Sequence, residues 1–216
     1  MIKSKAWNWK VAKAPWWEKP SPEIYPLIKK WQKQGFKKVL DLGCGVGRHS
    51  ILFAQNGFNV DAFDLSESGI EELKKKIGKE KLPIKLMIGD MLSLPYKNNS
   101  FDCLLAYHVV YHTDEKGIEK IIEEIKRVLK PGGEFFLDFN SKMSSAFKNK
   151  KNKHLTDHVL FKTEGHEINI PHYYADKKDV HSLLTGFEIL KFVHKEKSFP
   201  DNYQSAHYFV LGKNKK

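Results

Sequence analysis

Between residues 37 and 140, short apolar runs alternate with amphipathic stretches. This pattern is typical of strand and helix units on a parallel sheet, so it predicts an α/β fold. The predicted strands are 37–42, 58–63, 84–88, 101–107 and 133–139, and the predicted helices are 48–55, 66–77 and 115–130. Ser66 is expected to cap the second helix, and Pro131, Gly132 and Gly133 are expected to end the third helix and turn into the last strand.

The segments on either side of this core have different patterns. Residues 141–171 are polar, Lys-rich and weakly patterned, which predicts an insertion over a site. A helix at about 176–185 and strands at 187–194 and 205–213 are expected to close the chain. We expect one domain over 1–216. Its parts are a helical and aromatic N-terminal lid (1–36), a core (37–140), a substrate-side insertion (141–175) and a C-terminal helix with a strand pair (176–216).

Composition narrows the class of protein. Of the 216 residues, 41% are hydrophobic and 29% are charged, and no apolar run approaches the ~20 residues that cross a bilayer. The first twenty residues interleave Lys and Trp, so no secretory signal is visible. Two cysteines are too few for a disulfide framework or a Cys-rich metal site. We therefore expect a cytoplasmic protein without a membrane span or a metal.

The net charge of +11 is unevenly distributed. Residues 1–40 carry +8, residues 41–140 carry −3 and residues 141–216 carry +6. Arg48 and Arg127 are the only arginines in the sequence, whereas proteins that read nucleic acids depend heavily on Arg. Most of the charge is therefore interpreted as a Lys-rich surface, and a nucleic-acid partner is not expected.

A glycine-rich turn joins the first predicted strand to the first predicted helix. It reads Gly43-Cys44-Gly45-Val46-Gly47, and Asp64 lies 21 residues after Gly43, at the end of the next predicted strand. Glycines allow a sharp turn and a close approach of a ligand to the backbone, next to the positive end of a helix dipole. A carboxylate at position 64 can accept both ribose hydroxyls of an adenosine. The pattern predicts half of a nucleoside-cofactor site.

The spacing of the glycines argues against a dinucleotide. Dinucleotide sites have the pattern G-x-G-x-x-G, but here Arg48 stands at the position of the third glycine. Asp41, just before the turn, suits the ammonium of an amino acid better than it suits phosphates. A nicotinamide-dependent dehydrogenase is therefore disfavoured.

VLDLGCGVGRHS resembles the glycine motif of class I S-adenosylmethionine-dependent methyltransferases. The resemblance continues in order through Asp64, Gly89-Asp90-Met91, FDCLLAYHVVYHTD and LKPGGEFFLDF, and it covers about residues 37–140. It implies a doubly wound, mostly parallel, seven-stranded Rossmann-like sheet with an antiparallel C-terminal strand. It also implies that Asp41 and the glycine turn contact the methionine part of the cofactor, Asp64 the ribose, and Asp90 with the Met91 backbone the adenine.

The full set of expected cofactor residues is Asp41, Gly43, Cys44, Gly45, Gly47, Asp64, Leu65, Asp90, Met91 and His108. His108 and Tyr107, at the end of the fourth strand, are the candidates for a general base, although His108 could instead only pack beneath the cofactor. His112 is expected to be structural. His172, Tyr173 and Tyr174 could line an acceptor pocket or form a surface turn. Some of the aromatic side chains Trp7, Trp9, Trp16, Trp17 and Trp31 are expected to cover the cofactor.

The leading functional hypothesis is methyl transfer to a small-molecule acceptor, as in the type 11 group, with the flanking lysines attracting an anionic compound. A methyltransferase acting on RNA or protein and a cofactor-binding module without turnover remain alternatives, because a fold alone does not separate them. The fourth strand reads AYHVVYHT and lacks the Asn/Asp-Pro-Pro-aromatic element of DNA amino-methylating enzymes. Arsenic methylation is disfavoured because it needs several thiols. The sequence predicts neither the acceptor nor the oligomeric state.

Overall fold

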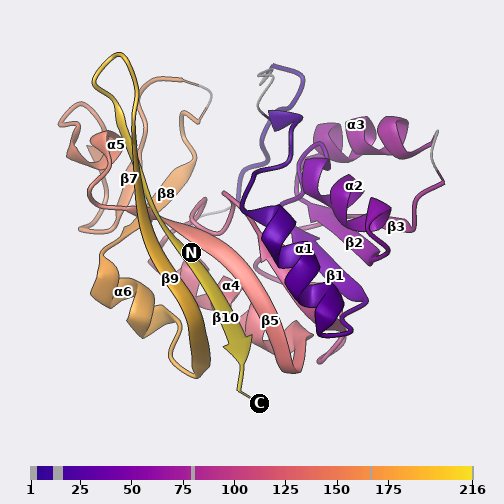
Figure 1. The fold of residues 1–216 in the computed structure, drawn as a ribbon. Helices are drawn as coiled ribbons and strands as arrows, with labels where there is room; N and C mark the ends of the chain where they lie inside the picture. Colours follow the sequence, from indigo (N-terminus) through magenta and orange to yellow (C-terminus); the bar gives the residue numbers. More distant parts are fainter. Residues whose placement is uncertain (1–3, 12–16, 79–80, 166, 216) are drawn as a thin grey trace.

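A central sheet organises the chain in the computed structural model, which describes residues 4–11, 17–78, 81–165 and 167–215. Its seven main strands lie in the order β3-β2-β1-β4-β5-β10-β9 (Figure 1). Their bounds are β1 Lys38–Leu42, β2 Asn59–Asp64, β3 Ile84–Ile88, β4 Phe101–Ala106, β5 Leu129–Ser141, β9 Phe187–Ser198 and β10 Gln204–Asn214. The first five strands are mutually parallel, and β10 runs antiparallel to both β5 and β9. The fold class predicted from the sequence is confirmed.

Helices cover both faces of the sheet. Their bounds are α1 Ile24–Lys33, α2 Arg48–Gln55, α3 Glu67–Ile77, α4 Glu115–Val128, α5 Ser145–Lys148 and α6 Lys177–Leu183. On one face, α4 buries an isoleucine stripe that includes Ile118 and Ile121 against a cluster containing Leu104 and Phe135. On the other face, α1 and α2 share a second cluster with residues of β1 and β4. This doubly wound arrangement leaves the carboxyl ends of the parallel strands free for a ligand.

Two predicted boundaries are corrected. The helix expected to end at residue 130 ends at Val128, and the strand expected from residue 133 already begins at Leu129. Leu129 pairs with Phe101, but Glu134 pairs with Cys103, so extra residues of β5 bulge out between these two pairs. The sequence Pro131-Gly132-Gly133 therefore forms an irregularity inside a strand rather than a turn before it, because proline and glycine suit such a bulge.

The segment 141–175 is more ordered than its polar composition suggests. It contains α5 and three short strands, β6 Lys153–His154, β7 Val159–Phe161 and β8 Pro171–Ala175. These strands pair antiparallel to one another, and the end of β8 pairs in parallel with the end of β5. His172, Tyr173 and Tyr174 are buried in β8, so a surface turn at this place is wrong. The apolar residues of β7 and β8 provide the burial that orders the segment.

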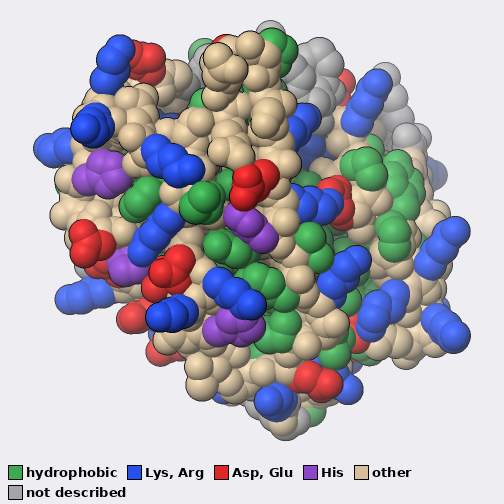
Figure 2. Space-filling view, turned by 60° about the vertical axis from the view of Figure 1, so that its left-hand side comes forward, with side chains coloured by type: hydrophobic (Ala, Val, Ile, Leu, Met, Phe, Trp, Pro, Cys, Tyr) green, Lys and Arg blue, Asp and Glu red, His purple; other side chains and the backbone are tan. Residues whose placement is uncertain are grey.

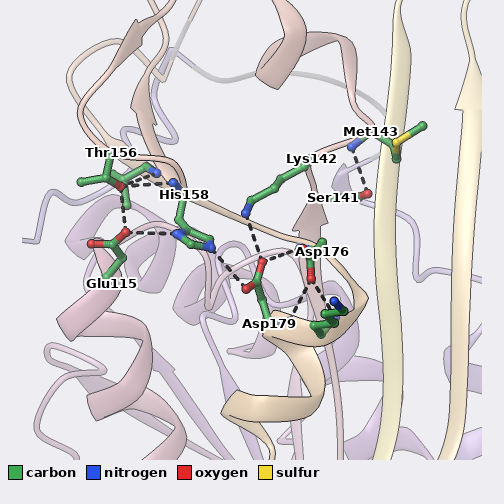
Figure 3. Close-up of polar contacts among 10 residues, drawn as sticks. Glu115, Ser141, Lys142, Met143, Thr156, His158, Asp176 and Asp179 are labelled. Carbon is green, nitrogen blue, oxygen red and sulfur yellow. Dashed lines mark hydrogen bonds and ion pairs between the residues drawn. The ribbon is translucent and has the colours of Figure 1, made fainter.

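A polar network attaches this segment to two helices (Figure 3). His158 lies between two carboxylates, with Nδ1 at 3.2 Å from Glu115 Oε1 on α4 and Nε2 at 3.2 Å from Asp179 Oδ1 on α6. Lys142 Nζ lies 3.2 Å from the other oxygen of Asp179. Thr156 Oγ1 donates a hydrogen bond to Glu115 at 2.8 Å. The network thus attaches the segment to α4 through Glu115 and to α6 through Asp179.

The N-terminal region has two distinct parts. Trp31 on α1 is fully buried, stacks on Phe53 of α2 at 5.7 Å and donates from Nε1 to Glu134 at 2.9 Å. This part packs on the sheet. Trp7, Trp9 and Trp17 instead lie near the glycine turn, while Trp16 falls outside the described residues. Among the described residues, no helix combines the length and apolarity needed to cross a membrane.

Candidate functional site

A cavity of about 270 Å³ opens at the carboxyl ends of β1, β2, β3 and β4. Consecutive segments from the four strand ends form its wall: 42–46, 63–65, 89–91 and 107–109. The remaining wall includes Trp7, Trp9, Trp17, Arg48, His49, Tyr111, His112, Glu167, Ile170 and His207. Residues that are far apart in the sequence, including both ends of the chain, therefore meet around one space.

The glycine turn is shaped by its close neighbours. Gly45 has a φ of +54°, and a Cβ added there would lie 2.4 Å from Cζ2 of Trp9. Gly47 has a φ of +82°, and its added Cβ would lie 2.1 Å from Leu73 on α3. Both positions combine a left-handed backbone with a contact that leaves no room for a side chain. Gly45 and Gly43 line the cavity, whereas Gly47 serves the packing of α3.

Asp64 and Asp90 both lie on the cavity wall. Asp64 accepts hydrogen bonds from the backbone amides of Gly45 and Ser66, each at 2.7 Å, and burial raises its pKa. Asp90 accepts a hydrogen bond from the Leu92 amide at 2.9 Å, so it also caps a local turn. The two carboxylates stand at the ends of neighbouring parallel strands, as expected. Leu65 and Met91 follow them on the same wall.

Asp41 does not lie on the cavity wall. It is 2% exposed behind the glycine turn and accepts a hydrogen bond of 2.5 Å from Ser50 Oγ on α2. Burial raises the pKa of Asp41 to about 6. Its position therefore favours a structural role over the expected contact with the cofactor. Cys44, beside it, does line the cavity, and burial raises the pKa of its thiol well above the usual range.

A buried carboxylate holds His108. The His108 amide donates to Asp138 Oδ1 at 2.6 Å, and His108 Nδ1 lies 2.6 Å from Asp138 Oδ2. His207 Nδ1 lies 2.9 Å from the same oxygen. Burial alone would raise the pKa of Asp138, but His108 and His207 hold it below its usual range. Because an ionised carboxylate only accepts hydrogen bonds, it fixes the hydrogen on Nδ1 of His108 and leaves Nε2 available to act as a base.

Tyr107 lines the cavity but is poorly suited to be a base. Its ring lies 5.2 Å from His49 and 6.4 Å from Phe136, measured between ring centroids. Burial raises the pKa of its hydroxyl above the usual range. A phenol that keeps its proton can donate a hydrogen bond but does not accept a proton from a substrate. Of the two candidates, the geometry favours His108.

A second group of polar side chains includes two residues of the same wall, His112 and Glu167. His112 Nε2 is 3.5 Å from Glu167 Oε1, and His172 Nε2 is 3.2 Å from Glu167 Oε2. Lys162 also contacts Glu167. Burial alone would raise the pKa of Glu167, yet the groups around it, Lys162 among them, hold it below its usual range. Burial also lowers the pKa of His172 to about 4. No local pattern in the sequence distinguishes Glu167 from Glu164 in the same polar segment.

The three tryptophans on the wall touch one another, with ring centroids 5.5 to 6.0 Å apart. Two hydrogen bonds tie this aromatic cluster to the start of α3: the Trp9 amide donates to Ser68 Oγ at 3.1 Å, and Ser66 Oγ donates to the Trp7 carbonyl at 2.6 Å. Ser66 also caps α3, as predicted, by accepting from the Gly69 amide. The N-terminal segment is therefore built into the site.

Residues 39–133 match the family model described as a methyltransferase domain. Among curated relatives, a sterol 24-C-methyltransferase of Gibberella zeae is 36% identical over 104 residues, covering 45% of this chain and 26% of that protein. A ubiquinone biosynthesis O-methyltransferase of Coxiella burnetii is 30% identical over 130 residues, covering 56% of this chain and 55% of that protein. The chain thus spans from about a quarter to just over half of the length of these relatives.

Solved structures show the same fold. A structure from Methanosarcina mazei described as one of the SAM-dependent methyltransferases has a TM-score of 0.73 at 22% identity, covering 91% of this chain and 98% of that one. An S-adenosylmethionine-dependent methyltransferase from Clostridium acetobutylicum has a TM-score of 0.67 at 20% identity, covering 88% and 89%. The fold is that of the class I S-adenosylmethionine-dependent methyltransferases. The chain thus resembles this class both in the matched domain and in its fold.

Proposed function

We propose that the protein transfers a methyl group from S-adenosylmethionine to a small-molecule acceptor. The observation that carries this proposal is the meeting of the glycine turn, Asp64, Asp90 and His108 around one cavity at the switch point of a doubly wound sheet. Relatives named for sterol and for ubiquinone biosynthesis support a small acceptor. The two buried, free cysteines suit a reducing compartment, so we also propose a cytoplasmic location.

The described residues fit this cofactor. We assign the ribose to Asp64, the adenine to Asp90 with Leu65 and Met91, and the methionine part to the turn from Gly43 to Val46. Two backbone amides already hold the Asp64 carboxylate in place. Asp41 and Gly47 support the turn from behind. The division of 1–216 into a lid, a core, an insertion and a C-terminal pair remains part of the proposal.

The bound cofactor supplies an activated methyl group on a sulfonium, so the protein's main task is alignment. His108 Nε2 is the base that takes a proton from the acceptor as the acceptor gains the methyl group. Asp138 orients the imidazole through Nδ1 and stabilises its protonated form. Because Asp138 acts through His108, it is a positioning residue. The proton passes from His108 to solvent after the transfer.

The acceptor side of the cavity combines aromatic and cationic groups. Trp7, Trp9 and Trp17 provide apolar surface, and Lys5 and Arg48 contribute to the wall. An aromatic, cation-bearing wall suits a flat or apolar molecule that carries an anionic group. We therefore propose an anionic small acceptor.

Ligand-dependent thermal stability tests the cofactor assignment. S-adenosylhomocysteine at about 100 times its dissociation constant should stabilise the native state by about 2.7 kcal/mol, whereas NADH should not. Asp64→Ala should remove most of the shift in melting temperature, and the exposed control Asp157→Ala should keep it. Stabilisation by NADH but not by S-adenosylmethionine or S-adenosylhomocysteine would overturn the proposal.

A further inference from the structure

We propose that His112, Glu167 and His172 bind one divalent transition-metal ion of the zinc type at the acceptor side of the cavity. The three side chains come from different places: His112 follows β4, Glu167 lies in the insertion, and His172 belongs to β8. Two imidazoles and one carboxylate form a ligand set that proteins use for zinc, with a remaining position open to water or substrate.

The spacing of the donor atoms fits such an ion. One donor atom of each residue lies within 4.8 Å of the others. His112 Nε2 is 3.5 Å from Oε1 of Glu167, and His172 Nε2 is 3.2 Å from Oε2 of the same carboxylate. Tetrahedral zinc with ligands at about 2.0–2.1 Å has ligand-to-ligand edges of about 3.3 Å. The rings of His112 and His172 are perpendicular, with centroids 5.0 Å apart. They can therefore approach one ion from two directions without colliding.

The hydrogen bonds around these side chains favour a cation at this place. His172 Nδ1 lies 2.8 Å from the Ile170 carbonyl oxygen. Because a carbonyl only accepts, Nδ1 carries the hydrogen, and the neutral ring directs a lone pair from Nε2 toward Glu167. Nε2 of His112 and Nε2 of His172 are both buried, and neither has a hydrogen-bond partner among the described residues. A cation between these nitrogens and the carboxylate would satisfy all three groups, and a carbonyl behind a ligating histidine is the usual supporting contact.

The other histidine pair on the wall is different. His108 and His207 each direct Nδ1 to Asp138, and His207 Nε2 lies 3.1 Å from Ser205 Oγ. Those nitrogens already have partners within the protein. The proposed ion therefore belongs to the first group and leaves His108 as the base.

Lys162 competes with the proposed ion. Its ammonium contacts Oε2 of Glu167, the same oxygen that faces His172. An ammonium beside a ligand carboxylate repels a divalent ion. It also occupies one of the lone pairs of the carboxylate oxygen. Replacing Lys162 by an uncharged side chain of similar length should therefore strengthen metal binding, whereas a purely structural ion pair predicts no such gain.

The position of the site suggests what the ion would do. His112 and Glu167 line the cavity beside Ile170 and Trp7, and the Trp7 and His112 rings are 6.1 Å apart. An ion with an open position there would bind an oxygen anion of the acceptor, such as a carboxylate or a deprotonated hydroxyl. This role rests on the proposed methyl transfer, but binding of the ion does not.

Metal titration of chelator-treated full-length protein tests the site. Co²⁺ is the probe, read by its visible absorption, with Zn²⁺ as competitor and Mg²⁺ as a negative control. We expect one ion per chain. Glu167→Gln and His172→Ala should each weaken binding by more than about 100-fold, because loss of a ligand exceeds the 10–100-fold cost of losing a supporting contact. Lys162→Met should tighten binding, and His154→Ala, an exposed histidine of the same segment, should change nothing.

Three results would overturn the proposal: no binding of one ion per chain, unchanged affinity in Glu167→Gln and His112→Ala, or loss of binding in His207→Ala alone. Glu167→Gln preserves the size of a half-buried side chain, so it keeps the test valid if His172→Ala fails to fold. The S-adenosylhomocysteine melting shift is measured on the same variants. If that shift persists while no metal binds, the ion site fails and the cofactor assignment stands.

Discussion

At the scale of single residues, His108 carries the sharpest chemical prediction. Its Nδ1 is committed to Asp138, and Nε2 is the nitrogen left for the acceptor. With an acceptor found by screening for S-adenosylhomocysteine formation, His108→Ala should lower kcat by ~10²-fold or more and leave cofactor affinity nearly unchanged. Asp138→Asn should also lower kcat and change the pH profile, because it no longer fixes the imidazole.

Two outcomes would contradict this role. Normal turnover of His108→Ala would make the residue structural, and a weaker cofactor affinity with normal turnover would make it part of the cofactor pocket. The control is Tyr107→Phe, which keeps the packing of the ring against Phe136 and removes only a hydroxyl that does not act as a base in this assignment.

The raised pKa of Asp41 predicts that the free energy of unfolding depends on pH. Burial raises its pKa to about 6, above the unfolded value of about 3.9. The folded state therefore binds a proton that the unfolded state releases, and the free energy of unfolding falls as pH rises from about 4 to about 6. Two pKa units correspond to about 3 kcal/mol. Asp41→Asn, which still accepts the bond from Ser50, should thus be more stable at pH 7 by up to about 3 kcal/mol.

Urea unfolding at pH 4 and pH 7 measures this difference. The gain should be much smaller near pH 4, where Asp41 is protonated in the folded state and about half protonated in the unfolded state. Asp157→Asn, at an exposed position, is the control and should show no pH-dependent gain. Equal effects of Asp41→Asn at both pH values would mean that folding does not raise the pKa of Asp41 and would return the residue to the cofactor-binding hypothesis.

Residues of the site were predictable to different degrees. Asp64 and Asp90 follow strands that the sequence pattern identifies, so their place at one sheet edge could be expected. Asp138 and His207 lie within strands and meet His108 only because β10 pairs antiparallel with β5. Glu167 depends on the path of the insertion. Local patterns contain no information about such pairings, although an acid within the apolar run FFLDF was a visible anomaly.

At the scale of elements, the attachment of the insertion can be tested. Asp179, in the first turn of α6, forms a capping box with Asp176 and also pairs with Lys142 and His158. Burial alone would raise the pKa of Asp179, but these hydrogen bonds and charges lower it. Its stabilising contribution is therefore present above the unfolded pKa of about 3.9 and is lost as pH falls through the lower folded value.

Asp179→Ala should lower the free energy of unfolding by about 1–2 kcal/mol, because it removes a cap and two ion pairs. Hydrogen exchange should quicken in 153–175 and α6 while β1 and β4 stay protected. Lys178→Ala, exposed on the same helix, should stay within about 0.5 kcal/mol of the natural protein. Uniformly faster exchange across the sheet would show that the network stabilises the whole fold and does not act locally.

Elements with a strong local pattern were predicted well. The bounds of α2 agree with the expected helix, and α3 begins after its predicted cap. The bulge in β5 was missed because Pro131 and Gly132 fit a turn as well as an irregular strand. The strands of the insertion were missed because each is only two to five residues long and is stabilised by its partners.

At the scale of the whole molecule, the distribution of the lysines bears on whether the acceptor is a small molecule or an RNA. Figure 2 shows Lys and Arg side chains scattered over one face among acidic and hydrophobic ones rather than gathered in a continuous band. A groove that makes several phosphate contacts would lose about 10³-fold in affinity between 50 and 200 mM salt. We expect only weak, sequence-independent binding of RNA.

Titration of labelled transfer and ribosomal RNA fragments at near-physiological salt, with S-adenosylhomocysteine present, measures this affinity. The protein without cofactor is the matched control, since a specific complex should depend on the loaded site. A nanomolar dissociation constant for one RNA, well separated from the others, would favour an RNA methyltransferase over a small-molecule enzyme.

The backbone of His108 has a consequence for the evolution of the protein. Its φ of +56° is a left-handed conformation, which costs a residue other than glycine about 1–3 kcal/mol. Selection that removed the strain by placing glycine at position 108 would also remove the imidazole and take one of two histidine partners from the buried Asp138. A lineage that keeps His108 therefore keeps the backbone strain together with the contact to this carboxylate.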